Sequence, residues 1–378
     1  MKNCIYCRKD KDEKEFTLEH IIPQFLGGAH APEFLKTRDV CKTCNNNLGL
    51  FVDASFEKNW LVTNWLRESS SAFYSKETPV GVSLKCMGNV SLSPPNLPED
   101  HVCEMWLGPH GEQVFWIRPH DKKLSAYVGG NPRTTKELRT RAYFLFSENT
   151  SKDVHKTWLS FEQAFRLRKV KKILCGEVIG ADPITIGFTE PDEIDKARSK
   201  FFIANAKARL QQKAKVVFDT KFDQRFLCKI AIGISFCLFG PKVLESAYGK
   251  ELHDGLWYRN GNDLPKIRGT NLFSKGTSSN LNEIIGFPNA ITILLFSNQD
   301  GISINLNISS KLNWTILCAP KDILTDDDIA KIGDGKILLL VRAMEVGVYL
   351  DLPFYLACKC GNTSHPMLDS ILERLKIK

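Results

Sequence analysis

The sequence lacks the segments that would place the chain in a membrane or among secreted proteins. Its first fifteen residues, MKNCIYCRKDKDEKE, contain no apolar run, so we expect no signal peptide. The longest apolar run, around 230–239, is too short to span a bilayer and predicts a buried helix. Twelve cysteines without a secretion signal favour a reducing cytoplasm, where some thiols bind metal and the others stay free.

Internal repeats, low-complexity tracts and nucleotide-binding fingerprints are also missing. No Walker-type or dinucleotide-binding pattern occurs, which argues against a P-loop or Rossmann enzyme. Positive charge is only in moderate excess, at +8 for 378 residues, which suits a polyanionic partner. Residues 1–50 carry eight Lys or Arg against seven Asp or Glu, so most of this excess lies further along the chain.

Two Cys-x-x-C pairs stand close together near the start of the sequence. The first pair is Cys4 with Cys7, and the second is Cys41 with Cys44. Thiolates are soft ligands that suit tetrahedral zinc, and two pairs of this spacing can supply all four ligands. A closed site of this kind provides much of the folding free energy of a small module.

Three further candidate ligands lie between the two pairs or directly after the second. Glu19 offers a carboxylate, His20 an imidazole and Asn45 an amide oxygen. Oxygen donors suit a hard ion such as Mg²⁺, and an imidazole can act as the base that activates water. On the residues alone, Asn46 and Asn47 are equally good oxygen donors.

The order C-x2-C, acidic-His-Ile-Ile-Pro, Gly-Gly and C-x2-C-Asn resembles the HNH endonuclease superfamily, and most closely its zinc-bearing members. The resemblance covers roughly the first 55 residues and implies a ββα-metal fold. It implies that His20 is the general base that deprotonates the attacking water. It also implies that Glu19 and Asn45 hold Mg²⁺ or Mn²⁺ against the scissile phosphate, and that the four cysteines bind a structural zinc.

The sequence departs from the commonest HNH pattern at two positions. The acidic residue is Glu19 rather than Asp, which moves the carboxylate outward by one methylene. The middle Asn of the family pattern is absent from the run FLKTRDV at 34–40. We therefore expect a backbone carbonyl or Thr37 to orient the imidazole of His20.

Other interpretations of these residues stay open. A zinc ribbon that only binds nucleic acid or protein would use the same four cysteines, with Glu19 and His20 as ordinary surface groups. His20 is also a candidate fifth zinc ligand. Cys358 and Cys360, with His365, have the composition of half a second metal site, although a lone Cys-x-Cys is more often incidental.

Beyond the cysteine-rich segment, the pattern predicts helices and antiparallel strands. Apolar residues at helical spacing predict a helix over 45–69, with Asn45 at its phosphate-favouring start. The run 218–240 predicts the core helix of a C-terminal domain, and 367–375 a terminal helix. Strands are expected at 102–107, 113–117, 290–296, 302–308 and 314–318.

Two stretches, 160–178 and 192–217, predict helices with a basic face. Such faces can contact the DNA backbone without reading bases, but charge runs on helices are also common as solvated surfaces. The candidate DNA-binding residues are Arg166, Arg168, Lys169, Lys171, Lys172, Lys207 and Arg209.

Together these features predict an α+β chain, in which a zinc-stabilised ββα-metal module precedes a larger mixed α/β region with antiparallel strands. We expect three successive parts. They are the HNH module over 1–68, a linker and mixed α/β region with basic helices over 69–217, and a C-terminal α+β domain over 218–378.

The expected activity is metal-dependent hydrolysis of DNA phosphodiester bonds, by nicking or with low sequence specificity, because one metal centre cuts one strand and no base-reading motif is evident. The expected setting is bacterial anti-phage defence in the cytoplasm, with DNA as the partner and no membrane. Two alternatives remain: a nuclease effector that a nucleotide or protein activates through its C-terminal region, and a non-catalytic zinc protein that binds nucleic acid. A protein partner or a homo-oligomer also stays open.

Overall fold

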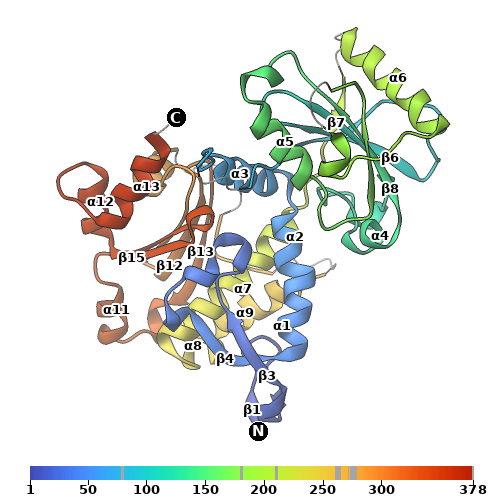
Figure 1. Cartoon of the computed structure of the whole chain (residues 1–378). Helices are drawn as coiled ribbons and strands as arrows, with labels where there is room; N and C mark the ends of the chain where they lie inside the picture. The colour runs from blue at the N-terminus through green and yellow to red at the C-terminus, as the bar shows by residue number, and fades with distance from the viewer. Residues whose placement is uncertain are drawn as a thin grey trace. The chain divides into compact units, whose positions relative to one another are not determined.

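The computed structural model describes residues 1–77, 81–178, 182–208, 212–259, 265–270, 272 and 279–376. The chain divides into two compact units (Figure 1). The first unit combines Met1–Glu57 with Asp219–Lys378, and the second is Lys58–Phe218. This division differs from the three successive parts expected from the sequence, because the N-terminal module packs with the C-terminal region instead of standing alone.

The first unit begins with a short hairpin of β1 (Lys2–Asn3) and β2 (Asp10–Lys11). Strands β3 (Phe16–His20) and β4 (Lys36–Cys41) then pair antiparallel, and α1 (Lys42–Leu48) follows directly. A π-helical turn over Gly49–Asp53 carries α1 into α2 (Ala54–Glu57).

The single helix predicted over 45–69 is wrong, because the segment starts earlier than expected and is interrupted before its end. Helix α1 already starts at Lys42, because Cys41 caps it by accepting a hydrogen bond from the backbone N–H of Cys44. The helical segment is interrupted at Asn59, whose side chain accepts a hydrogen bond from the backbone N–H of Leu61 and starts α3 (Trp60–Ser71) in the second unit. A capping residue takes a non-helical backbone conformation, so it ends one helix and begins another.

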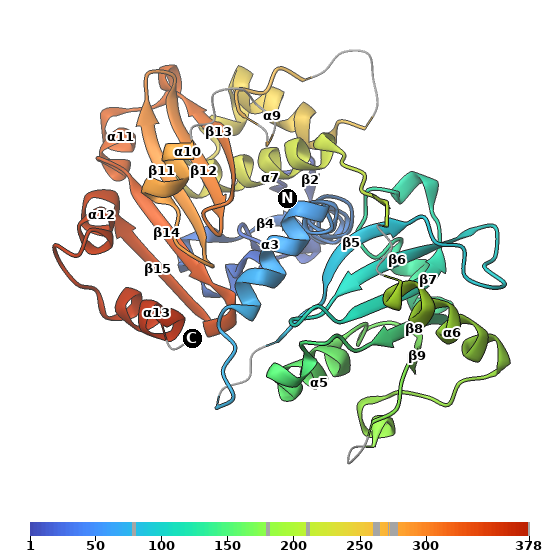
Figure 2. The same cartoon turned by 90° about the horizontal axis from the view of Figure 1, so that it is seen from above.

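The core of the first unit is α7 (Thr220–Phe239), the helix expected from the apolar run at 218–240. It packs on β13 and on α9 (Ala247–Trp257), as Figures 1 and 2 show. The sheet has the antiparallel order β13-β12-β11-β14-β15, which confirms the three C-terminal strands predicted from sequence. Its strands are β11 (Ile291–Asn298), β12 (Gly301–Ile308), β13 (Leu312–Pro320), β14 (Lys336–Val341) and β15 (Val346–Asp351).

Shorter helices complete the first unit. They are α8 (Lys242–Glu245), α10 (Ser279–Ile285), α11 (Asp326–Ile332), α12 (Leu352–Lys359) and α13 (Pro366–Lys376), the last confirming the predicted terminal helix. Phe56 of α2 stacks on Phe226 of α7, with ring centroids 3.9 Å apart, so the N-terminal helices are docked on the core helix. Every helix in the described part of the chain is too short or too polar to cross a membrane.

The second unit is built on a six-stranded sheet of order β10-β5-β6-β7-β8-β9, in which only β8 and β9 run parallel. Its strands are β5 (Lys85–Val90), β6 (His101–Leu107), β7 (Gln113–Pro119), β8 (Thr140–Leu145), β9 (Val170–Leu174) and β10 (Ala214–Lys215). Besides α3, its helices are α4 (Pro132–Glu137), α5 (Val154–Gln163) and α6 (Glu193–Lys207). The predicted hairpin of β6 and β7 is confirmed.

Alternate residues of the strands feed two apolar cores, one on each face of this sheet. Trp116 packs on one face with Phe161 of α5, and Phe115 packs on the other with Phe202 of α6. This is the side-chain alternation of a strand buried on both faces. Helices α5 and α6 therefore lie on opposite faces of the sheet.

Both predicted basic helices are shorter than expected. The first ends at Gln163, because the chain turns at Phe165 with a φ of 58° and continues as β9. The apolar residues at 161, 165, 170 and 173 have a spacing that fits a helix. Lys172 and Ile173 nevertheless belong to strand β9, which pairs with β8 and in which successive side chains alternate between the two faces. The second is confirmed over Glu193–Lys207, but β10 replaces its expected end, and 209–211 lie outside the described residues.

We expect Phe202→Ala to destabilise the second unit by about 3–5 kcal/mol, because its fully buried ring stacks on Phe115 with centroids 4.4 Å apart. The neighbouring Phe201 is only partly buried, so Phe201→Ala should cost clearly less. Urea unfolding followed by circular dichroism measures both variants. Equal losses would show that α6 is not anchored through Phe202.

Candidate active site and metal centre

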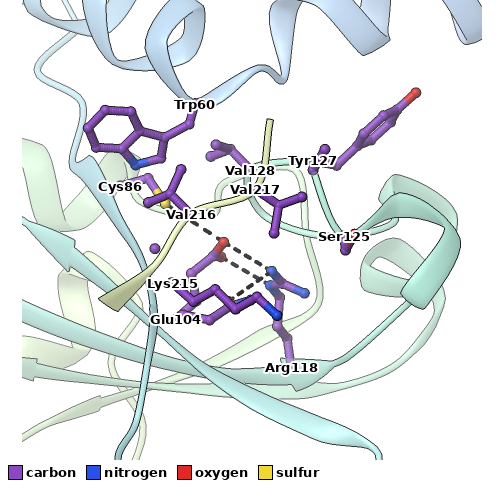
Figure 3. A pocket seen from close by; sticks show the side chains of 13 residues that line it. Trp60, Cys86, Glu104, Arg118, Ser125, Tyr127, Val128, Lys215, Val216 and Val217 are labelled. Carbon is purple, nitrogen blue, oxygen red and sulfur yellow. Dashed lines mark hydrogen bonds and ion pairs between the residues drawn. The ribbon is translucent and has the colours of Figure 1, made fainter. Parts of the chain in front are cut away.

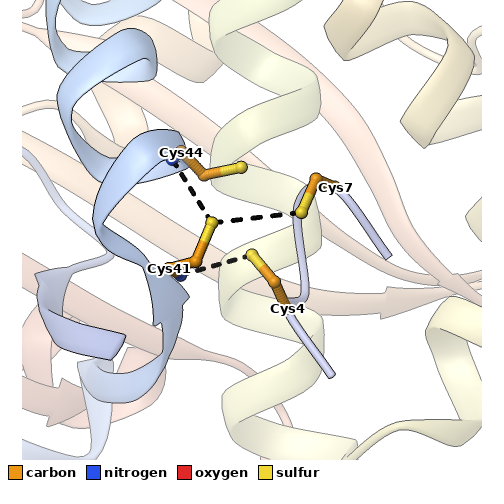
Figure 4. Close-up of side chains that lie close together, drawn as sticks. All are labelled: Cys4, Cys7, Cys41 and Cys44. Atoms are coloured by element: carbon orange, nitrogen blue, oxygen red, sulfur yellow. Dashed lines mark hydrogen bonds between the residues drawn. The ribbon is translucent and has the colours of Figure 1, made fainter. Parts of the chain in front are cut away.

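The four cysteines predicted to bind zinc converge on one point (Figure 4). Their Sγ atoms all lie within 4.8 Å of one another. Zinc–thiolate bonds of about 2.3 Å place the sulfurs of a tetrahedral site about 3.8 Å apart, so a small closure of this cluster accommodates the ion. Cys4 and Cys7 come from the turn between β1 and β2, whereas Cys41 ends β4 and Cys44 lies on α1.

The surroundings of the cluster favour a thiolate at Cys4, whereas they favour protonated thiols at Cys7 and Cys44. The backbone N–H of Cys41 donates to Cys4 Sγ at 3.4 Å, and that of Cys44 donates to Cys41 Sγ at 3.5 Å. The hydrogen bond from the Cys44 thiol, with the backbone N–H groups of Cys41, Cys7 and Tyr6, lowers the pKa of Cys4 to about 4. The same thiol pair raises the pKa of Cys44, and burial raises that of Cys7. The residue types and the spacing of the four sulfurs fit a structural zinc, which binds its cysteine ligands as thiolates.

The half-site expected at Cys358, Cys360 and His365 gains no further ligand. Within the described ranges, the four N-terminal cysteines are the one group of three or more His, Cys, Asp or Glu side chains close enough to hold a metal ion. The C-terminal cysteines therefore stay isolated thiols in this structure.

Glu19 points into the first unit and is only 4% exposed. Its Oε1 lies 2.9 Å from Nζ of Lys229, a residue of α7 that is itself 2% exposed. The same Nζ lies 2.6 Å from Oδ2 of Asp53, at the end of the π-helical turn. One buried ammonium thus joins two carboxylates of the N-terminal module to the core helix.

The charges of this triad stabilise one another against burial. Burial raises the pKa of both Glu19 and Asp53, and the Lys229 ammonium opposes that rise. Burial alone would lower the pKa of Lys229, but the carboxylates of Asp53 and Glu19 outweigh it and raise this pKa. Asp53 Oδ1 and the Tyr6 hydroxyl are also buried, and neither has a hydrogen-bond partner among the described residues.

This geometry bears on the role that the family resemblance implies for Glu19, namely that of a ligand of a magnesium ion. The ammonium of Lys229 already occupies the position of a cation beside the Glu19 carboxylate. In this arrangement Glu19 does not fit as a ligand of a catalytic ion, because its carboxylate is buried and paired. Its evident role here is to fix β3 on α7.

His20 follows Glu19 on β3 and is partly exposed. Burial and then the nearby Lys36 ammonium lower the pKa of His20, so its imidazole is neutral near pH 7. The Nδ1 atom is buried without a hydrogen-bond partner among the described residues. Thr37, expected to orient this ring, instead donates its hydroxyl to Asp39 Oδ2 at 2.5 Å.

Asn45 lies in α1, which begins at Lys42, so it is not at the start of its helix as expected. Its Nδ2 donates to Thr17 Oγ1 and to the Leu18 carbonyl, each at 3.0 Å, which ties α1 to β3. The amide oxygen is the atom that remains for an ion. In the described part of the chain, no hydrogen bond joins Asn45 to Glu19 or His20.

Two of the predicted DNA-binding residues on β9 are engaged inside the second unit. Lys171 pairs with Asp195 at 2.5 Å and with Asp192 at 3.2 Å. Lys172 is buried, and its Nζ donates to the Phe161 carbonyl at 2.7 Å. These two side chains hold α6 and α5 against the sheet, so their charge is already used within the fold.

The remaining candidates differ in exposure. Arg168 is half-buried and donates to the Gly129 carbonyl at 2.6 Å. Arg209 lies outside the described residues. The exposed candidates are Arg166, Lys169 and Lys207.

Sequence reasoning missed Lys229 and Asp53. Lys229 is the single charged residue in the apolar run 227–239, and a lone charge in a buried helix indicates an internal ion pair. That signal exists in the sequence, but it does not identify the partners. Asp53 and Glu19 come from segments far away in the chain.

Removing a zinc ligand should unfold the N-terminal module. We expect wild type to carry one zinc per chain and Cys44→Ser to lose it, because three thiolates leave the site incomplete. Cys360→Ser is the matched control, since Cys360 is exposed and outside the cluster. Elemental analysis of purified protein measures this, and full zinc occupancy in Cys44→Ser would contradict the assignment.

Removing the buried ammonium should be more costly than removing a surface one. Lys229→Met leaves two unpaired buried carboxylates, and we expect a loss of about 3–5 kcal/mol in unfolding free energy. Lys331→Met removes a half-exposed partner of Asp328 and should cost less than about 1 kcal/mol. Adding Glu19→Gln and Asp53→Asn to Lys229→Met should restore part of the lost unfolding free energy, because no unpaired carboxylate remains. Urea unfolding measures all of these variants. A triple variant no more stable than Lys229→Met would contradict the assigned triad.

Comparison with known proteins agrees with the geometry of the first segment. The model of an HNH endonuclease family matches residues 4–61, which include all four cysteines together with Glu19, His20 and Asn45. No curated protein and no solved structure matches the chain. With its four-cysteine centre and the histidine that follows Glu19, the segment at residues 4–61 is similar to the HNH endonuclease family, and the match leaves the remainder of the chain unassigned.

Proposed function

We propose that the protein is an HNH endonuclease that hydrolyses phosphodiester bonds of DNA, with His20 as the general base. The observation that carries this proposal is the position of His20, a partly exposed and neutral imidazole on β3, in a segment similar to the HNH endonuclease family. Strands β3 and β4 followed by α1 have the order of a ββα-metal unit. The zinc centre would hold that unit together.

In this mechanism the Nε2 lone pair of His20 takes a proton from the water that attacks the phosphate, because Nδ1 is buried. A neutral imidazole is the form that can do this, and general-base catalysis contributes roughly 10²–10⁴-fold in rate. Mg²⁺ or Mn²⁺ is the cofactor we propose, and it would neutralise charge that builds on the phosphate. Asn45 offers an amide oxygen for it, whereas Glu19 positions β3 through Lys229.

The exposed basic residues of the second unit, Arg166, Lys169 and Lys207, are suited to the DNA backbone rather than to bases. We therefore propose nicking or cleavage with low sequence specificity. The biological setting that we propose, defence against phage DNA in a bacterial cytoplasm, follows from the family resemblance alone.

A second candidate function is a nuclease effector that a nucleotide or a protein partner activates. The second unit favours it, because it is a compact unit with its own sheet and cores, and the family match ends close to its start. Such an effector would not cleave DNA in the absence of its activator.

Cleavage of supercoiled plasmid in Mg²⁺ or Mn²⁺ tests the proposal. We expect wild type to nick or linearise the plasmid, EDTA to stop it, and His20→Ala to slow it at least about 100-fold. His30→Ala is the matched control, since His30 lies near the motif without a proposed role, and it should change the rate less than about twofold.

Equal cleavage by wild type and His20→Ala would exclude His20 as the base. If neither variant cleaves DNA while zinc is bound, two functions remain: a non-catalytic zinc protein and an effector that needs an activator. DNA binding without cleavage favours the non-catalytic zinc protein. Cleavage that appears only when a nucleotide or a protein partner is added favours the effector.

A further inference from the structure

The end of the hairpin formed by β3 and β4 places a lysine directly opposite His20. The two strands pair antiparallel, with His20 opposite Lys36 and Glu19 opposite Thr37. Side chains of directly opposed residues project from the same face of such a ladder, and successive pairs alternate between the two faces. Lys36 therefore lies beside the proposed general base, on the same face of the hairpin.

Burial of these side chains follows the same alternation. Glu19 and Thr37 are 4% and 7% exposed, whereas His20 and Lys36 are both partly exposed. The ammonium of Lys36 and the carboxylate of Glu33 both act electrostatically on the imidazole of His20. The outward face at this end of the hairpin thus combines a neutral base with one cation and one carboxylate.

Lys36 is not a substitute for the orienting group that we expected beside His20. When Nε2 accepts the proton of water, Nδ1 must already carry the ring proton, and an ammonium cannot accept a hydrogen bond from it. The buried Nδ1 has no partner among the described residues. What Lys36 adds to this face is therefore its positive charge.

The counter-charge of Lys36 is weakly held. Its Nζ lies 2.5 Å from Oε1 of Glu33, whose side chain is 87% exposed, and Glu33 is its single carboxylate partner among the described residues. Water screens a pair of this kind, so an incoming anion can replace the carboxylate at little cost. The Lys36 side chain itself is only 16% exposed, which restricts the positions that its ammonium can take.

A buried ion pair of the second unit shows the contrast. Arg118 donates to Glu104 through Nη2 at 3.0 Å and through Nε at 3.1 Å, and both side chains are 3% exposed (Figure 3). A buried carboxylate that loses its cation is strongly destabilising, so a pair of this kind does not exchange its partner for a ligand. The pair of Lys36 with the exposed Glu33 lacks that constraint.

The proposed reaction requires positive charge on the face that carries His20. Attack of water on the phosphate adds negative charge to its non-bridging oxygens, and cations held in place beforehand stabilise that charge. Glu19, the carboxylate that the family resemblance assigns to the catalytic ion, is paired with Lys229 instead. The chain itself can supply positive charge at this point through Lys36.

We propose that Lys36 binds a non-bridging oxygen of the scissile phosphate beside His20, and that the DNA backbone replaces Glu33 as its partner. This proposal rests on the proposed endonuclease function and adds a cation that contacts the substrate. Lys36 takes no part in bond making, because its ammonium keeps its protons while His20 accepts the proton of the attacking water. A phosphate contact carries no base information, in keeping with low sequence specificity.

The salt dependence of DNA binding tests this contact without cleavage. The full-length His20→Ala chain is titrated into a labelled duplex of about 20 base pairs, at salt concentrations between about 50 and 200 mM, and fluorescence anisotropy measures Kd. Each phosphate contact contributes about 0.9 to the slope of log Kd against log salt concentration. Adding Lys36→Met should therefore lower this slope by about 0.9, and Lys36→Arg should keep it.

Two further variants of the His20→Ala chain distinguish a phosphate contact from general surface charge and from a structural ion pair. Lys14→Met removes an exposed lysine that precedes β3, at the opposite end of the hairpin ladder, and should leave the slope unchanged. Glu33→Gln should tighten binding at least about twofold, because it removes the carboxylate that competes with the phosphate. Circular dichroism and zinc content check that every variant folds.

Plasmid cleavage by chains that retain His20 provides a second readout, in which Lys36→Met should lower kcat at least about tenfold. An unchanged slope or kcat in Lys36→Met, an equal loss in Lys14→Met, or weaker binding by Glu33→Gln would overturn the contact. If wild type cleaves the plasmid in that case, the proposed function stands without Lys36. Failure of the His20→Ala chain to bind the duplex up to about 1 mM would overturn the contact and the proposed function together.

Discussion

The Lys229 ammonium between Glu19 and Asp53 is the contact on which the first unit depends. It is buried, it is supplied by the core helix, and both of its partners belong to the N-terminal module. Removing it would leave a buried carboxylate at Glu19 and a largely buried one at Asp53 without a counter-charge, which is strongly destabilising. The stacked rings of Phe56 and Phe226 reinforce the same junction with apolar contact. The four-cysteine cluster brings β4, α1 and the turn between β1 and β2 together, and Lys229 joins the module to α7.

This attachment changes what the acidic residue of the motif does. An exposed carboxylate beside a catalytic histidine would bind an ion, whereas Glu19 is buried and neutralised by a lysine from α7. The adjacent His20 remains partly exposed because neighbouring residues on a strand face opposite sides. Strand β3 therefore fixes the module through Glu19 and leaves the next residue, His20, partly exposed.

The sequence predicted features that depend on local pattern and missed those that depend on distant partners. Cysteine spacing identified the four-cysteine cluster, and the apolar run at 218–240 identified α7, since both are contained in short segments. The stretch at 160–178 was misread because its apolar residues fit a helix as well as the turn and strand that actually form. The partners of Lys229 could not be predicted, because Glu19, Asp53 and Lys229 come from segments far apart in the chain.

The first unit is made of two separate stretches of chain, with the whole second unit between them. A ribosome therefore completes the cysteine-rich segment long before it reaches α7, and at that stage Glu19 and Asp53 have no lysine beside them. The N-terminal segment can attain its final packing only after Lys229 has emerged, so a prematurely terminated chain would contain the HNH residues without the arrangement described above. The order of synthesis thus delays assembly of the site until most of the protein exists.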